Sequence, residues 1–74
     1  MKPINEKLRD VRKGNKYTQE YIAEYLDTNQ AMIWRYEKGI TPIPLDKFKK
    51  LCQLYGISSD YFLGLPQGLK YPGK

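Results

Sequence analysis

The stretch that decides the fold covers residues 18–39 and reads TQEYIAEYLDTNQAMIWRYEKG. Apolar residues in its first half recur at the spacing of one buried helix face, namely Ile22, Ala23 and Leu26. Thr18 can cap this helix, and Asn29 can cap a second helix that runs to about Lys38, where Gly39 ends it. Because only about three residues link the two helices, they must cross steeply, and the second projects from the body of the protein.

One face of the predicted helix 30–38 carries side chains that suit contacts with DNA. At about 100° per residue, five residues share an arc of about 140°, namely Gln30, Ala31, Trp34, Arg35 and Lys38. The opposite side holds Met32, Ile33, Tyr36 and Glu37. Arginine can pair with guanine through two hydrogen bonds, glutamine can pair likewise with adenine, and alanine can touch the methyl group of thymine. The alternative is that Trp34 packs on a neighbouring helix and that Arg35 is ordinary solvated surface.

The chain on either side predicts three more helices, each with its own apolar residues. The first is about ten residues long, ends at Gly14, and has its stripe at Ile4, Leu8 and Val11. The second follows a loop at 40–44 with two prolines, ends at Gly56, and has its stripe at Leu45, Phe48, Leu51, Cys52 and Tyr55. The last begins after Ser58, ends at Gly64, and carries Tyr61, Phe62 and Leu63.

We therefore expect one all-α domain, a compact five-helix bundle, at residues 1–64, followed by a short C-terminal tail at 65–74. The 74 residues suffice for a single domain. The chain has 13 basic and 8 acidic residues, a formal net charge of +5. On so small a surface this charge can attract a polyanion such as nucleic acid, although an excess of lysine that only maintains solubility gives the same count.

The composition argues against catalysis, cofactor binding and membrane insertion. The chain lacks histidine, the commonest general base and metal ligand, and its acidic residues are scattered. No apolar run approaches the roughly 20 residues of a membrane span, and the N-terminus lacks the apolar stretch of a secretory signal. The single cysteine, Cys52, cannot form an intramolecular disulfide. We expect a non-enzymatic protein without cofactor or metal, located in the cytoplasm and encoded by a bacterium or a phage.

Several fragments, in their order and spacing, resemble the phage-repressor and Cro-like helix-turn-helix family, also called the XRE family. The fragments are Thr18-Gln19-Glu20 with Ile22-Ala23, the run from Asn29 to Gly39, Leu45-Asp46 through Leu51, and Ser58 to Gly64. The resemblance covers roughly Ile4 to Gly64. It implies a five-helix domain of the lambda-repressor type. In such a domain the second and third helices bind double-stranded DNA, usually as a homodimer on a two-fold operator.

By this resemblance, nine residues match positions that contact DNA: Thr18, Gln19, Asn29, Gln30, Ala31, Met32, Trp34, Arg35 and Lys38. Gln19 would bond a phosphate, aided by the N-terminus of its helix. The positions that approach bases are Asn29, Gln30, Ala31 and Arg35. Trp34 and Met32 would lie at the edge of the contact, and Lys38 would lie along the DNA backbone. Arg12 and Glu37 match a pair that bridges the first helix to the recognition helix, which makes Glu37 structural.

Five residues depart from the family pattern. Asp27 stands where glycine is common, and it can adopt the left-handed conformation at a cost of about 1 kcal/mol relative to glycine. Thr28 stands where valine is common. Met32 replaces a small hydroxyl residue, and Ile40-Thr41 replaces a commonly basic pair, which removes contacts to phosphates. We therefore expect modest affinity for DNA per protomer.

Two groups of residues have an ordinary structural interpretation. Most tyrosines are expected to pack, either at core spacing or beside the apolar stripes, and the three at core spacing are Tyr36, Tyr55 and Tyr61. The lysines at 47, 49 and 50 share an amphipathic helix with Asp46, so a solvated face is expected rather than a second phosphate patch. Cys52 is expected to act as a small hydrophobic residue.

The leading hypothesis is a transcriptional regulator, a repressor in particular, that binds a short palindromic operator as a homodimer. The two recognition helices would then lie about 34 Å apart, one turn of B-DNA. The dimer interface is expected at the last helix and near Leu65 and Leu69. The second hypothesis is a protein-interaction module, such as an antitoxin component or adaptor. It would bind a partner protein through Trp34 or the tail at 65–74.

Overall fold

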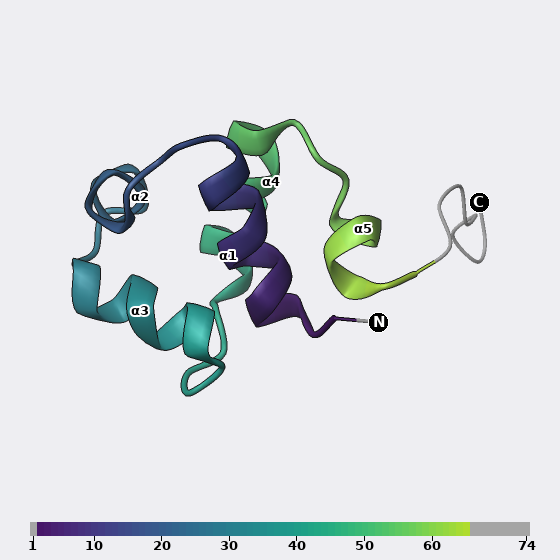
Figure 1. Cartoon of the computed structure of the whole chain (residues 1–74), viewed down its shortest axis with the longest axis horizontal. Coiled ribbons are helices and arrows are strands. Elements are labelled where there is room, and N and C mark those ends of the chain that lie inside the picture. Colours follow the sequence, from purple (N-terminus) through teal and green to yellow (C-terminus); the bar gives the residue numbers. More distant parts are fainter. Residues whose placement is uncertain (1, 66–74) are drawn as a thin grey trace.

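The computed structural model describes residues 2–65, which form five α-helices around one core (Figure 1). The helices are α1 (Ile4–Gly14), α2 (Gln19–Tyr25), α3 (Gln30–Lys38), α4 (Leu45–Tyr55) and α5 (Ser59–Leu63). These residues contain no strand, which confirms the predicted all-α class. α3 contacts both α2 and α1, and α1 also contacts α5. None of the helices in the described part has the length and apolar character that a membrane span requires.

The helix ends follow the predicted capping residues. The side-chain oxygens of Thr18, Asn29 and Ser58 each accept a hydrogen bond from a backbone N–H in the first turn of α2, α3 and α5, at 3.0, 3.0 and 3.1 Å. Gly39 ends α3 with a φ of 75°. A Cβ atom at this position would lie 3.2 Å from the side chain of Asn5, so both the conformation and the close approach favour glycine.

Buried apolar residues from every helix meet in the core, and they are Leu8, Ile22, Ala23, Leu26, Ile33, Tyr36, Phe48, Leu51 and Phe62. Phe62 is only 1% exposed, and its ring meets Phe48 edge to face at 5.6 Å between centroids. Full burial of such a side chain contributes about 1.5–3 kcal/mol. This ring anchors the five-residue helix α5 on the bundle, and Lys7 of α1 adds a hydrogen bond to the carbonyl of Tyr61 at 2.9 Å.

The turn between α2 and α3 is built around Asp27, whose φ of 56° confirms the predicted left-handed conformation. The backbone N–H of Thr28 then donates to the carbonyl of Ala23 at 2.9 Å. Lys47 donates to the carbonyl of Leu26 at 2.9 Å. Lys47 is thus half-buried and holds the end of α2, so the prediction that it belongs to a solvated face is wrong. The reason is that its amine reaches a carbonyl that the end of α2 leaves unpaired.

Two residues predicted at core spacing are exposed, Leu45 by 80% and Tyr61 by 44%. Leu63, which the last predicted helix carries, is 53% exposed. The first turn of α4 extends past the core, which leaves Leu45 outside it. In α5 the core takes Phe62, and each neighbour points about 100° away from it. Tyr36, by contrast, is buried and Tyr55 half-buried, as predicted, and burial raises the pKa of Tyr55.

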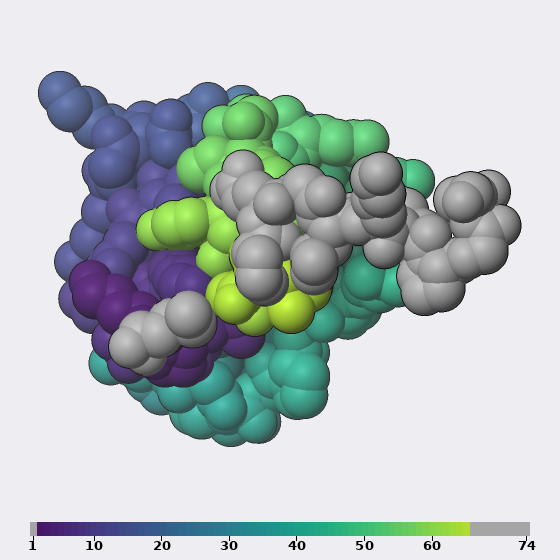
Figure 2. Space-filling view, turned by 90° about the vertical axis from the view of Figure 1, so that its right-hand side faces the viewer, coloured from purple at the N-terminus to yellow at the C-terminus, as the bar shows by residue number. Residues whose placement is uncertain are grey.

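An apolar groove of about 430 Å³ results from this arrangement, and we call it the α4–α5 groove. Its lining residues are Leu45, Phe48, Lys49, Cys52, Gln53, Ile57, Ser58, Ser59 and Leu63. Cys52 is half-buried in this apolar lining, as predicted for a small hydrophobic residue, and burial raises the pKa of its thiol. Figure 2 looks onto the end of the molecule that carries α5, beside the N-terminal residues. Leu65, at the start of the predicted tail, is 47% exposed, whereas Leu69 lies outside the described residues.

Candidate nucleic-acid interface

α3 lies at the edge of the molecule, with one side against α1 and α2 and the other uncovered (Figure 1). The uncovered side exposes Gln30, Ala31, Trp34, Arg35 and Lys38. The covered side buries Ile33, Tyr36 and Glu37. This division agrees with the arc predicted from the helical period. Met32, predicted at the edge of a DNA contact, is half-buried and packs against the core, so it lies on the covered side.

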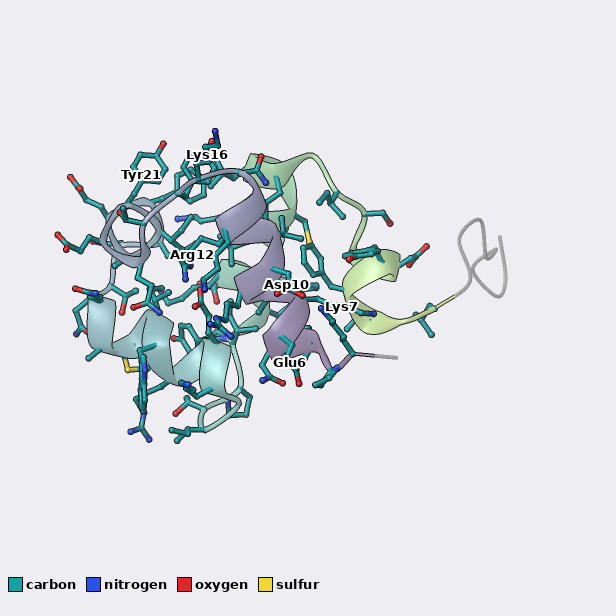
Figure 3. All side chains as sticks on the ribbon, in the orientation of Figure 1. Glu6, Lys7, Asp10, Arg12, Lys16 and Tyr21 are labelled. Carbon is teal, nitrogen blue, oxygen red and sulfur yellow. The ribbon has the colours of Figure 1, made fainter. Side chains whose placement is uncertain are left out.

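A buried ion pair lies beneath the uncovered side of α3. Arg12 reaches from α1 into the space between α1, α2 and α3 (Figure 3). Its Nε donates to Oε2 of Glu37 at 2.7 Å and its Nη2 donates to Oε1 at 3.1 Å, with both side chains less than 10% exposed. The Nη1 group of Arg12 also donates to the carbonyl of Tyr17 at 2.9 Å. The predicted pair is therefore present, and it fixes α1, α3 and the segment before α2 to one another.

Gln19 connects this ion pair to the exposed side of α3. Its Nε2 donates to Oε1 of Glu37 at 3.1 Å, and its Oε1 accepts from Nε2 of Gln30 at 3.4 Å. The side chain of Gln19 is thus half-buried, and both its amide nitrogen and its amide oxygen are hydrogen-bonded within the protein. The sequence predicted a bond from Gln19 to a phosphate and did not predict these two contacts. This contact chain from Arg12 to Gln30 orients the amide of Gln30, one of the predicted base-contacting residues.

Arg35 is held in a different way, by a residue of the loop after α3. Its Nε donates to Oγ1 of Thr41 at 3.0 Å. Sequence reasoning missed this contact, because it treated Ile40-Thr41 only as the replacement of a basic pair. The pattern that could have indicated it is a hydroxyl residue two positions after the glycine that ends the helix. Gln30 and Arg35 are therefore each held through one polar atom.

Trp34 is 45% exposed, so its ring is only partly covered, on the side of α3 that faces α1. The Nζ of Lys38 lies 5.8 Å from the centroid of the Trp34 ring, a cation–π arrangement on the outer side of α3. Both side chains line a polar cleft of about 400 Å³ between α1 and α3. The cleft brings Arg9 and Lys13 of α1 next to this side of α3. Sequence reasoning missed these two cations, because charges on a helix face are usually solvated surface.

Thr18 and Asn29, the two remaining predicted contacts, are exposed at the starts of α2 and α3. Their side-chain oxygens are engaged as caps. The amide nitrogen of Asn29 carries donors that such a cap does not use. The structure thus brings eight of the nine predicted residues to the α2–α3 side of the molecule, while Met32 turns inward. Within residues 2–65, no cluster of cysteine and acidic side chains is arranged to hold a metal ion.

A family model described as helix-turn-helix matches residues 8–62. Two curated proteins of Bacillus subtilis (strain 168) are similar to this chain. The uncharacterized HTH-type transcriptional regulator YobD is 40% identical over 60 residues, and the HTH-type transcriptional regulator ImmR is 33% identical over 61 residues. The aligned segments cover 81% and 82% of this chain but 54% and 48% of those proteins. The chain therefore spans about half the length of the curated relatives it matches.

The fold also resembles a solved structure, the P22 c2 repressor protein in complex with a synthetic operator. The TM-score is 0.76 at 21% sequence identity, and the match covers 84% of this chain and 94% of that chain. At this identity the likeness shows the fold. The five helices, the steep α2–α3 turn and the match over residues 8–62 agree with one another. The chain belongs to the helix-turn-helix family, in its phage-repressor and Cro-like (XRE) branch.

Proposed function

We propose that this chain binds double-stranded DNA in a sequence-dependent way by inserting the uncovered side of α3 into the major groove. The observation that carries the proposal is that this side presents Gln30 and Arg35, each held through one polar atom, with Ala31 between them. Side chains that are already oriented lose less conformational freedom when they pair with base edges. The guanidinium suits guanine, the amide suits adenine, and the methyl group of alanine suits thymine.

Contacts to the DNA backbone follow from the groups around α3. Lys38 lies at the C-terminal end of α3, and Arg9 and Lys13 lie across the polar cleft, so these cations can neutralise phosphates on one flank. On the other flank, the free N–H groups at the start of α2 near Thr18 and Gln19 can donate to a phosphate. Asn29 and Trp34 lie between these flanks and the base-contacting residues.

We further propose that the chain regulates transcription, as a repressor, and acts as a homodimer. The support for regulation is that the two curated relatives are named transcriptional regulators. The support for a dimer is the α4–α5 groove, with the exposed Leu63 in its lining and the exposed Leu65 two residues later in the chain, because apolar side chains of this size favour burial against another protein surface. A protein partner other than a second copy could use the same groove. A protein that binds chromosomal or phage DNA would be located in the bacterial cytoplasm.

The test is a gel-shift selection from randomised duplexes, using the whole 74-residue chain. We expect enrichment of a short two-fold-symmetric sequence whose half-sites lie about one helical turn apart. Lys38→Ala should weaken binding to all duplexes and reduce the slope of log K against log salt by about 1. The matched control is Lys50→Ala on α4, which removes the same charge from an exposed position outside both α3 and the lining of the α4–α5 groove. Selection without any enriched sequence, or equal effects of the two lysine variants, would contradict the proposal.

A further inference from the structure

We propose that Thr41 is a positioning residue that sets the base preference of Arg35 by holding the Nε atom of its guanidinium. This inference rests on the proposed function, since it concerns how the uncovered side of α3 recognises bases. Thr41 lies outside α3, in the loop that the two prolines of residues 40–44 require. It would therefore affect sequence preference without contacting a base itself.

The geometry ties the loop to Arg35 at both the backbone and the side chain. The carbonyl of Arg35 accepts hydrogen bonds from the N–H groups of Ile40 at 3.0 Å and Thr41 at 3.4 Å. Gly39 turns the chain back with its left-handed conformation, which makes these bonds possible. The hydroxyl of Thr41 then accepts from Nε of the same arginine at 3.0 Å. Thr41 is half-buried whereas Arg35 is exposed, so a side chain packed in the loop holds one that extends into solvent.

The choice of atom matters for recognition. A guanidinium is a planar group with five N–H donors, and the end-on pairing with O6 and N7 of guanine uses its two Nη groups. Because Thr41 takes the Nε donor, the two Nη groups remain for a base, and the plane of the group is restricted. Without the hydroxyl acceptor, the long side chain samples more rotamers and can pair with phosphates, which carry no sequence information. Loss of the hydroxyl should therefore reduce discrimination between bases more than it reduces affinity in general.

A merely structural role for Thr41 makes a different prediction. If Thr41 only shapes the loop after α3, a residue of the same shape should replace it fully. Thr41→Val keeps the branched shape and removes the acceptor, whereas Thr41→Ser keeps the acceptor and removes a methyl group. The two variants therefore separate the hydroxyl from the shape, and Thr41→Ala serves as a second hydroxyl-free variant if Thr41→Val fails to fold.

The experiment uses the full chain and two labelled duplexes, measured by fluorescence anisotropy at one salt concentration. One duplex carries the sequence selected by the wild-type protein. The other is the same duplex with one guanine replaced by another base, namely the guanine that the wild type prefers and the Arg35→Ala variant does not. We expect the affinity of Thr41→Val for the selected duplex to be about three- to tenfold lower than that of the wild type. Its affinity for the substituted duplex should equal that of the wild type. Thr41→Ser should behave as the wild type. Adding Thr41→Val to Arg35→Ala should cause no further loss, since the two residues act as one unit.

A spectroscopic measurement on the free protein tests the contact itself. The Nε–H resonance of Arg35 should be visible and slow to exchange in the wild type and in Thr41→Ser, and fast in Thr41→Val. The inference is overturned if Thr41→Val keeps the wild-type ratio of affinities or loses affinity equally on both duplexes. A wild-type chain that prefers no duplex overturns the proposed function and this inference together. A wild-type preference that is undiminished in Thr41→Val overturns this inference alone.

Discussion

The α3 side and the α4–α5 side of this molecule expose opposite chemistry. On α3 the exposed residues are mainly cationic and amide side chains, and Gln30 and Arg35 are each held by a hydrogen bond. The α4–α5 groove is lined by the exposed Leu45 and Leu63, and the exposed Leu65 follows two residues after Leu63 in the chain. Oriented donors and acceptors suit a ligand with a fixed pattern of polar groups, whereas apolar side chains suit another apolar surface. The comparison supports the proposal of one surface for DNA and a separate surface for protein.

The largest expected effect lies beneath the α3 side. Glu37→Ala leaves the guanidinium of Arg12 buried without its carboxylate and removes the acceptor for Gln19, so we expect a loss of about 3–5 kcal/mol in the free energy of unfolding. Urea unfolding measures it. The control is Asp10→Asn in the exposed pair with Lys2, whose hydrogen bond lowers the pKa of the Asp10 carboxyl. That variant should unfold as the wild type does, because exposed pairs contribute little. Equal losses in the two variants would mean that burial does not distinguish the pairs.

The next effect concerns recognition. Arg35→Ala should lose about 1–3 kcal/mol of binding free energy on the selected duplex and little on unrelated duplexes. The reason is that a bidentate contact to one base is lost while the contacts to phosphates remain. Anisotropy titrations of both duplexes measure the difference. A uniform loss on every sequence would instead assign Arg35 to the DNA backbone.

A change on the α4–α5 side should affect assembly and leave recognition intact. Leu63→Lys places a charge beside the α4–α5 groove, and we expect self-association to weaken by about 1–2 kcal/mol. Sedimentation equilibrium measures the association. Affinity for a duplex with a single half-site should not change, because this residue lies away from α3. If the variant binds the half-site more weakly but associates normally, the division between the two sides is wrong.

The smallest expected effect tests the turn that sets the angle of α3. Asp27→Gly removes the left-handed strain, so the free energy of unfolding should rise by about 0.5–1 kcal/mol. Urea unfolding again provides the measurement, with Gly39→Ala as the opposite case. The alanine must adopt a φ of 75° with its Cβ 3.2 Å from Asn5, so that variant should be less stable than the wild type. Destabilisation by Asp27→Gly would show that the aspartate makes a favourable contribution that outweighs its strain.

Local patterns made the helices and the α3 face predictable. The caps at Thr18, Asn29 and Ser58 act within one turn, and the left-handed conformation of Asp27 follows from its place in a short link. The exposed arc of α3 follows from the helical period, because a helix at the edge of the molecule has only one buried side. These features depend on residues close together in the sequence.

Apart from the local contact between Arg35 and Thr41, the features that sequence reasoning missed depend on where distant elements meet. A helical period shows which residues share a face but not where the core ends, so Leu45 and Tyr61 were expected at core positions and are exposed. The amine of Lys47 reaches a carbonyl 21 residues away in the chain, and Gln19 reaches Glu37 across 18 residues. Such contacts follow from the packing of α2 against its neighbours, which no local pattern specifies.

The most direct test of the central claim is a titration of the protein with duplex DNA, following the fluorescence of Trp34 at two salt concentrations. Trp34 is the only tryptophan in the sequence and lies on the exposed side of α3. We predict a change in fluorescence on binding, with log K falling by about 0.9 per neutralised phosphate for each tenfold rise in salt. A titration without any change, together with no shift of the duplex on a gel, would contradict DNA binding through α3.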